Sequence, residues 1–312
     1  KETGIDIIHL IRAELSVKDI NKEYEPDVLQ KLWKVEEGIY LEFARICDKY
    51  HLRYFCAYGT ALGAIRHKGF IPWDDDMDMG MPREDYEKFI KIAPKELQGN
   101  FELLEPRLTK GYVMPFAKLT RSDTTFVESA DIDRKYHSGI FIDIFPFDLV
   151  SENMEERKKA QKKCWFCARL MVLCEYPKPN LPSSITGVKK ALVYAACDVA
   201  HFGLKALGKT PANLQKKYIK YATEYGNTHK DAYLYADFGT YNAEIDFGRP
   251  DQYFDKDTLF PAVDVPYENI LVKVPHDWDR YLTDSYAKYM ELPPIEQRHS
   301  HYPSKLEFSK DA

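Results

Sequence analysis

Hydrophobic and polar positions change their spacing several times along the chain, and each change predicts a new element. Apolar residues recur at helical spacing from Pro26 to Tyr50, and a proline suits the first turn of a helix. Runs of aromatic and β-branched residues bounded by turn residues predict strands. The expected helices are 7–15, 26–50, 83–92, 152–175, 191–207, 211–229 and 276–290. The expected strands are 53–58, 101–104, 113–119, 124–127, 140–145 and 270–274, and residues 232–260 show no regular pattern.

The order of these elements predicts an α/β (α+β) fold, in which a mixed sheet forms the core and a largely helical elaboration follows it. We divide the chain into an N-terminal extension (1–26), a core (27–150) and a helical elaboration with the C-terminal region (151–312). A chain of 312 residues has room for one large domain with such an addition.

The helix expected at 191–207 is the most apolar of the set. It is interrupted by Asp198, His201 and Lys205. These interruptions make it too broken to cross a membrane. We therefore expect a core helix. The alternative is an interfacial helix, aided by the basic residues of 157–169 and by Lys189 and Lys190.

Composition is that of an ordinary globular protein, with 45% hydrophobic and 30% charged residues. The net charge of −5 argues against general nucleic-acid binding, which needs a basic surface. Six cysteines do not make a disulfide framework in a chain of this length. Cys164 and Cys167 have zinc-like spacing, but on a helix this spacing marks one apolar face, and we prefer that interpretation. The opening residues lack a signal-peptide pattern, so we expect a cytoplasmic protein.

The strongest chemical signal is the acidic block within residues 58–86. Four of the five positions from Asp74 to Asp78 are acidic. In an extended segment, Asp74, Asp76 and Asp78 project from one face while the residues between them face away. Carboxylates crowded in this way repel one another. A hard divalent cation such as Mg²⁺ or Mn²⁺ would relieve that repulsion.

A solvated acidic loop or an incidental calcium site is the alternative explanation of this block. The flanking segments 71–73 and 79–82 are too apolar for a solvated loop. An EF-hand also fails, because the required glycine and glutamate are missing at their offsets after Asp74.

Small and basic residues precede the block. Gly59, Thr60 and Gly63 permit a close approach of the backbone, and Arg66, His67 and Lys68 supply positive charge. Carboxylates, a small-residue turn and a basic cluster together describe a site for a phosphorylated substrate.

Two further charged residues lie within apolar runs. Asp143 is the one acid among five apolar residues in 140–145, and such a carboxylate needs a partner, which a shared metal would supply. Its alternative role, capping a turn, suits Asp148 better. Lys118 lies inside the run PFAKLT, where a lone lysine is commonly an edge or snorkelling residue.

These residues resemble the LicD and fukutin-related phosphotransferases, which are built on the nucleotidyltransferase fold. The matching segments are YGTALGAIRHKGFIPWDDDMDMGMPREDYEKF (58–89), PFAKLTRSDTT (115–125) and GIFIDIFPFD (139–148), with a weaker match at YLTDSYAKYMELPPIEQRH (281–299). The resemblance implies a short helix at 62–68 and a strand at 76–78. The chain departs from the generic nucleotidyltransferase pattern by having Thr60 after the glycine and 15 residues between Thr60 and Asp76, a longer insertion that the LicD-like group carries. It departs from the family at 286–290, which read Tyr-Ala-Lys-Tyr-Met where the family tends to have Tyr-Gly-Asp-Tyr-Met.

The resemblance implies a nucleotidyltransferase-like core at 27–150 and a set of roles for its residues. Asp74, Asp76, Asp78 and Asp143 would be metal ligands; Asp76, Asp78 and Asp143 would be catalytic; and Gly59, Thr60, Arg66, His67, Lys68, Trp73 and Lys118 would bind substrate. Arg298, His299 and His301 follow the last helix and either bind phosphate or lie on the surface.

The activity that the resemblance implies is transfer of a substituted phosphoryl group, such as phosphocholine, from a CDP-linked donor such as CDP-choline. The acceptor would be a sugar hydroxyl of a surface glycan: a teichoic acid, a lipopolysaccharide or a capsule. We expect a lipid-linked acceptor and peripheral association with the inner membrane face. Two alternatives stay open, a nucleotidyltransferase that adds NMP to a small molecule or protein, and a catalytically silent binding scaffold.

Overall fold

The computed structural model describes residues 23–128, 134–179, 181, 185–239, 252–298 and 300–310. The expected helix 7–15 lies outside these residues. The helices are α1 (Pro26–Lys49), α2 (Tyr58–Arg66), α3 (Arg83–Glu96), α4 (Met154–Glu175), α5 (Gly187–Ala206), α6 (Pro211–Ala222), α7 (Glu224–Thr228), α9 (Lys256–Leu259), α10 (Trp278–Tyr286) and the 3₁₀ helix η3 (Ile295–Gln297). The strands are β1 (Phe55–Cys56), β2 (Asp78–Pro82), β3 (Phe101–Leu104), β4 (Ala117–Arg121), β5 (Thr125–Val127), β6 (Phe141–Val150), β7 (Leu234–Asp237), β8 (Phe254–Asp255), β9 (Val263–Tyr267), β10 (Ile270–Val274) and β11 (Lys305–Glu307).

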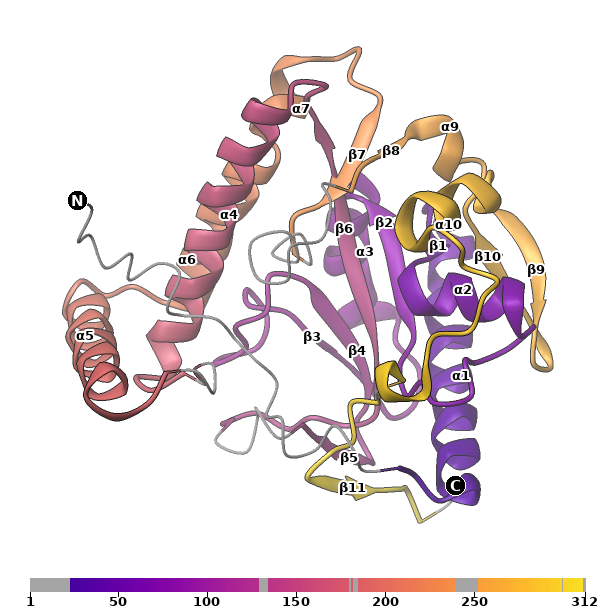
Figure 1. The fold of residues 1–312 in the computed structure, drawn as a ribbon, viewed down its shortest axis with the longest axis horizontal. Helices are drawn as coiled ribbons and strands as arrows, with labels where there is room; N and C mark the ends of the chain where they lie inside the picture. Colours follow the sequence, from indigo (N-terminus) through magenta and orange to yellow (C-terminus); the bar gives the residue numbers. More distant parts are fainter. Residues whose placement is uncertain are drawn as a thin grey trace.

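Strand β6 is the centre of a seven-stranded mixed sheet (Figure 1). It pairs with β2 in parallel along one edge. Its other edge pairs antiparallel with β4 over the first half of the strand and with β7 over the second half. The sheet order β1-β2-β6-β4-β3, with β7 and β8 joined through β6, confirms the predicted α+β class.

Local sequence explains where several helices begin. Pro26 occupies the first turn of α1, where its missing N–H costs no hydrogen bond. The side chain of Asn153 accepts hydrogen bonds from two backbone N–H groups at the start of α4, and the Thr210 hydroxyl accepts one, from Asn213 N, at the start of α6. Helix α1 then buries Leu32, Ile39 and other apolar residues of one face against the sheet.

Helices α4, α5 and α6 form a helical lobe beside the sheet (Figure 1). Cys164 and Cys167 lie in the apolar cluster between α4 and α6, with Tyr218, as expected for an apolar helix face. The prediction of a core helix at 191–207 is wrong. Only Val193, Cys197 and His201 of α5 are buried, because one face alone packs against α4. None of the helices in the described part of the chain is long and apolar enough to cross a bilayer.

Other differences concern short elements. Residues 74–77 are not part of a strand, and β2 begins only at Asp78. Strands β7 and β8 and helix α9 lie in the stretch 232–260, where the sequence shows no pattern, and residues 240–251 lie outside the described part. Strand β11 pairs with β5, and Leu306 stands opposite Phe126 although the two are far apart in the sequence. No local pattern reports such a contact.

Candidate active site

Three neighbouring strands place Asp78, Asp143 and Lys118 in one row. Asp78 of β2 is the register partner of Asp143 of β6. Asp143 is in turn the register partner of Lys118 of β4. Residues directly opposite one another in paired strands project from the same face of the sheet. The two carboxylates and the ammonium group therefore meet on one face.

The acidic loop that precedes β2 keeps the alternation expected of a strand without joining a ladder. Asp75 and Met77 are buried, whereas Asp74, Asp76 and Asp78 are partly open. The backbone of Asp78 is fixed on both sides: its N–H donates to Thr60 Oγ1 (2.7 Å) and its carbonyl accepts from Ala57 N (2.8 Å). Helix α2 thus sets the position of the acid, and Thr60 contributes its hydroxyl to the scaffold.

The acids of this site disfavour one another's charged forms. Burial raises the pKa of Asp78 well above its usual range, and the charges of Asp76, Asp143 and Asp74 raise it further. The pKa of Asp74 is raised by burial and then by Asp76. Burial raises the pKa of Asp143 to about 7, against the lowering effect of Lys118. A cation bound among these acids would therefore reduce their mutual repulsion.

Lys118 is the buried cation of the row. Its Nζ lies 3.3 Å from Asp143 Oδ1 and 3.5 Å from Glu128 Oε2, and it sits 3.2 Å from the centroid of the Phe141 ring. Its side chain is 3% exposed, so the edge or snorkelling interpretation does not describe it.

Glu36 is a fifth acid at the site that sequence reasoning missed. It comes from α1, is 1% exposed, and its Oε2 accepts no hydrogen bond from the described residues. Burial raises its pKa, and the charges of Asp76, Asp75, Asp74 and Asp78 add to that effect. A signal existed in the sequence, because position 36 falls on the apolar face of α1 between Leu32 and Ile39.

Asp75 is 1% exposed and ties distant segments to the acidic loop. Its Oδ2 accepts a hydrogen bond from the Tyr24 hydroxyl (2.7 Å), and its Oδ1 accepts from the backbone N–H of His301 (2.7 Å). The His301 ring places Nδ1 3.3 Å from Asp75 Oδ1 and 3.4 Å from Asp76 Oδ2. Burial lowers the pKa of His301, but the contact with Asp75 and the charge of Asp76 outweigh that and raise it.

Gly59 lies against the acidic loop. A Cβ at this position would stand 2.7 Å from Asp74 Oδ2, so the first turn of α2 approaches the acids only because the residue has no side chain. Gly63 has a different reason: its Cβ would meet the carbonyl oxygen of Gly69 at 2.5 Å. The first glycine shapes the site, and the second permits the turn that follows α2.

Arg66, the last residue of α2, binds the C-terminal segment. Arg66 Nη1 donates to the carbonyls of Tyr289 (2.8 Å) and Glu291 (3.4 Å), and its Nε donates to His67 Nε2 (2.9 Å). Lys68 is exposed in the turn, with φ at 60°. Of the predicted cations, Lys118 is the one in contact with an acid of the row.

Trp73 lies beside this basic group. The His67 ring meets it edge-on with 6.3 Å between centroids, and the Arg298 guanidinium lies 4.6 Å from its ring centroid. Arg298 is thus packed on Trp73, while His299 lies outside the described residues.

The chemistry of the acids suits a divalent cation, although they do not form a finished metal centre. Among the described residues, no three carboxylate, imidazole or thiol groups converge closely enough for that. The donors are nevertheless all hard oxygens. Two buried ones, Glu36 Oε2 and Asp143 Oδ1, accept no hydrogen bond in that part of the chain, and Asp143 Oδ1 has only the ion pair with Lys118. Buried carboxylate oxygens with open acceptor capacity fit Mg²⁺ or Mn²⁺.

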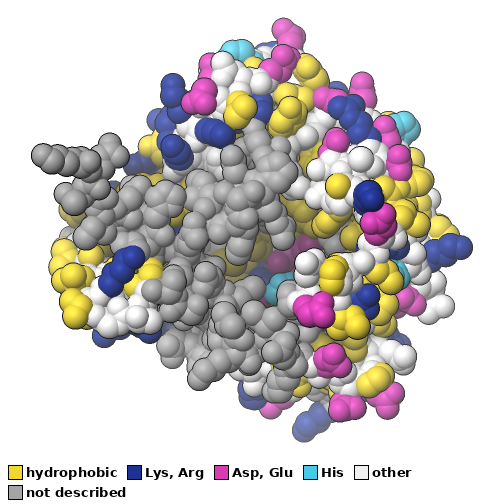
Figure 2. All heavy atoms as spheres, in the orientation of Figure 1, with side chains coloured by type: hydrophobic (Ala, Val, Ile, Leu, Met, Phe, Trp, Pro, Cys, Tyr) yellow, Lys and Arg dark blue, Asp and Glu magenta, His cyan; other side chains and the backbone are white. Residues whose placement is uncertain are grey.

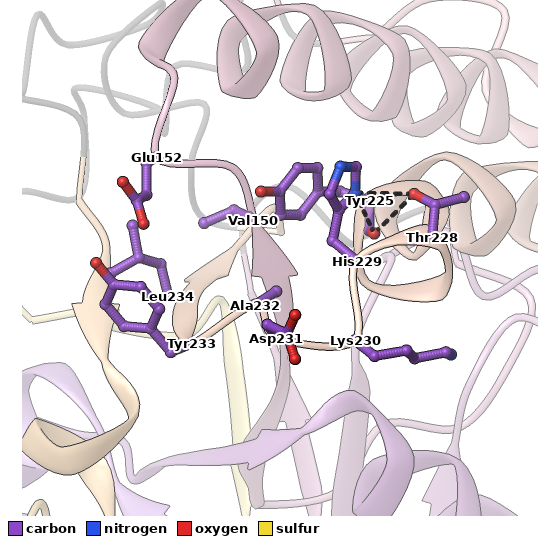
Figure 3. A pocket seen from close by; sticks show the side chains of 10 residues that line it. All are labelled: Val150, Glu152, Tyr225, Thr228, His229, Lys230, Asp231, Ala232, Tyr233 and Leu234. Atoms are coloured by element: carbon purple, nitrogen blue, oxygen red, sulfur yellow. Dashed lines mark hydrogen bonds between the residues drawn. The ribbon is translucent and has the colours of Figure 1, made fainter.

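A separate pocket of about 320 Å³ lies at the other end of β6, between that strand, α7 and β7 (Figure 3). It is lined by Val150, Glu152, Tyr225, Thr228, His229, Lys230, Asp231, Ala232, Tyr233 and Leu234. His229 turns its Nδ1 back to the carbonyl of Tyr225 (3.2 Å) and to the Thr228 hydroxyl (3.0 Å). None of the predicted site residues lines this pocket.

A mixed sheet that gathers carboxylates from a loop and two adjacent strands beside a buried lysine is an arrangement suited to enzymes that act on phosphate esters. The sequence model of the family described as LicD/FKTN/FKRP, nucleotidyltransferase domain, matches residues 51–178. A relative of that family is 30% identical over 83% of this chain, so the chain belongs to the LicD family and is a phosphotransferase.

Relatives of the chain match it over different lengths. The lipopolysaccharide cholinephosphotransferase LicD of Haemophilus influenzae is 30% identical over 263 residues, which cover 83% of this chain and 90% of that protein. An uncharacterised protein of Rickettsia typhi is 32% identical over 108 residues, 35% of this chain and 32% of its own length. Another of Rickettsia prowazekii is 45% identical over 50 residues, 16% of this chain and 19% of its own length.

Proposed function

We propose that this phosphotransferase moves phosphocholine from CDP-choline to a sugar hydroxyl of a cell-surface glycan, and that it needs Mg²⁺ or Mn²⁺. The observation that carries the proposal is the row of Asp78, Asp143 and Lys118 beside Asp74 and Asp76. The choice of head group and acceptor rests on the likeness to a lipopolysaccharide cholinephosphotransferase that spans 83% of the chain.

The carboxylates would hold the cation. Asp76 and Asp78 would be its main ligands, with Asp74, Asp143 and Glu36 completing or orienting the set. A bound divalent cation neutralises diphosphate oxygens of the donor and so stabilises the charge that develops in phosphoryl transfer. Asp78 is held in place by Thr60 and Ala57, so its carboxylate is already oriented before a donor binds.

The reaction itself exchanges one phosphorus–oxygen bond for another. The acceptor hydroxyl oxygen attacks the distal phosphorus of the donor, the bond to the cytidine-bearing phosphate breaks, and CMP leaves. Asp143, which stands opposite Asp78 in the sheet, would either complete the metal site or accept the hydroxyl proton. Lys118 neutralises a phosphate oxygen from its place beside Asp143.

We place this enzyme in the cytoplasm at the inner membrane face, acting on a lipid-linked glycan. Support comes from the name of the Haemophilus relative, whose acceptor is a lipopolysaccharide. A peripheral position would let a charged, water-soluble donor meet an acceptor that is anchored in lipid.

Product analysis tests the proposal. The protein is incubated with CDP-choline, Mg²⁺ and a lipopolysaccharide acceptor, and the acceptor is examined by mass spectrometry. We expect the acceptor to gain phosphocholine and CMP to be released. An acceptor that gained CMP or AMP would identify the protein as a nucleotidyltransferase. A protein that transferred no group from CDP-linked choline, ethanolamine, ribitol or glycerol would be a catalytically silent scaffold.

A matched pair of variants tests the site. Asp78→Asn should reduce turnover by roughly a thousandfold or more, because it removes one charge from the ligand set without changing its size. Asp264→Asn is the control, since this exposed aspartate lies on β9 and pairs with Lys273 (2.9 Å). Chelation with EDTA should stop the native enzyme, and Mg²⁺ should restore it. Full turnover in EDTA or in Asp78→Asn would refute the metal site.

A further inference from the structure

Helix α5 carries a stripe of apolar residues that are all exposed. Val188 is 77% exposed, Val199 75% and Phe202 65%, which are high fractions for large apolar side chains. The full stripe consists of Val188, Leu192, Ala195, Val199, Phe202 and Ala206. A contiguous exposed apolar surface on a folded protein marks a contact site.

The stripe has the geometry of an outward helix face. Its positions are separated by four, three, four, three and four residues, so their side chains line up along one side of the helix. The buried residues Val193, Cys197 and His201 lie on the opposite side. His201 fixes that inner side, since its Nδ1 lies 2.7 Å from the carbonyl oxygen of Leu173 on α4. Because the inner side of α5 packs against α4, the apolar stripe faces the solvent.

Positive charge flanks the stripe. Lys189 and Lys190 lie at one end of α5, Lys205 and Lys209 at the other, and all four are exposed. Asp198 is the only acid among the 20 residues of α5. Hydrophobic and lysine side chains meet at the edge of the molecule where α5 lies (Figure 2). An apolar stripe edged by lysines is complementary to anionic headgroups above an apolar layer.

We propose that the outer face of α5 is a docking surface for an anionic phospholipid membrane, with the helix lying in the plane of the interface. The helix is about 30 Å long at 1.5 Å per residue, and its apolar residues occupy a stripe rather than the whole circumference. This pattern favours lying on a membrane over crossing it. The membrane contact itself does not depend on the proposed function. Its biological role does, because that role would be to bring the active site to a lipid-linked acceptor.

The test is vesicle co-sedimentation of the full chain, which requires no turnover. Vesicles of phosphatidylcholine alone are compared with vesicles that also contain phosphatidylglycerol, at low and high salt. We expect binding to the anionic vesicles that weakens with salt. Val199→Asp with Phe202→Asp should weaken binding by about tenfold or more. Lys189→Gln with Lys190→Gln should weaken it by about fivefold per lysine.

Leu271→Asp is the matched control, because this leucine is 62% exposed on β10, outside the helical lobe. It should bind vesicles as the native protein does. All variants alter exposed side chains, so their thermal unfolding should match that of the native chain.

The proposal is overturned if anionic vesicles leave the native protein in solution at low salt, or if the stripe variants bind undiminished. It is also overturned if the native chain dimerises and the stripe variants abolish only the dimer, which would make the stripe a contact between copies. Loss of turnover with vesicle binding intact would count against the proposed function alone.

Discussion

Replacing Asp143 with asparagine should stabilise the metal-free protein while it destroys activity. The side chain is 8% exposed and its pKa is raised from 3.8 to about 7 by burial. This difference of roughly three pH units corresponds to about 4 kcal/mol at about 1.36 kcal/mol per unit. That amount is the free energy that the folded state loses when this carboxylate ionises without a metal. Asparagine has nearly the same size and carries no charge, so the variant avoids that loss.

The sign of the pH dependence follows from the direction of the pKa change. A carboxyl group whose pKa is raised keeps its proton in the folded state at a pH where the unfolded chain has released it. Rising pH therefore destabilises the native protein between about pH 4 and pH 7, and the contribution is constant above that. Between pH 5 and pH 8 the advantage of Asp143→Asn over the native protein should widen by about 3 kcal/mol.

Urea unfolding in EDTA at pH 5, 6, 7 and 8 measures this gap. Native protein and Asp143→Asn are compared at each pH, so that groups whose pKa does not depend on the charge of Asp143 cancel in the difference. Asp78 does not cancel completely, because the charge of Asp143 raises its pKa. Addition of Mg²⁺ at pH 8 should then stabilise the native protein and help the variant far less, since the ionised carboxylate gains a partner. A gap that stays constant with pH, or a variant less stable than the native protein at pH 8, would refute the reasoning.

Two further predictions concern the neighbours of the acids. Glu36→Gln should weaken Mn²⁺ binding, measured by calorimetry, by about tenfold or more. Glu37→Gln on the same helix is the control and should leave the affinity unchanged, because Glu37 is partly exposed and lies near Glu268 rather than the acids. Equal Mn²⁺ affinities in the two variants would show that Glu36 is not part of the site. Gly59→Ala should displace the Asp74 carboxylate and reduce metal affinity, but it should lower the free energy of unfolding by less than about 1 kcal/mol, because its new methyl group meets the end of a side chain. Gly63→Ala meets backbone atoms and should lower it by about 1–3 kcal/mol. Urea unfolding of both variants measures these values, and the reverse order of stabilities would contradict this account.

The acidic block and the class of fold were readable from the sequence because their signals are local. The alternation of Asp74, Asp76 and Asp78 with buried neighbours needs only the period of an extended chain, and it persists although β2 starts at Asp78. Asp143 was readable as a lone acid in an apolar strand. Its alignment with Asp78 and Lys118, however, depends on strand register, and the tertiary structure supplied it.

The helix 191–207 shows how composition can mislead. Its apolar content predicted a core helix, but it has two apolar faces on opposite sides, and α4 covers only one of them. Sequence gives the number of apolar residues and their spacing. Whether each apolar face of a helix is buried depends on which other helices or strands pack against it in the folded protein.

Glu36 and His301 are brought to the acids by tertiary structure. They are far from the acids in the sequence, and they arrive there because α1 packs against the sheet and the C-terminal segment returns to Asp75. Periods of two and 3.6 residues report which side of an element is buried, not what it is buried against. The local chemistry of the acids was therefore determined by sequence, and their neighbours by the packing of elements far apart in the chain.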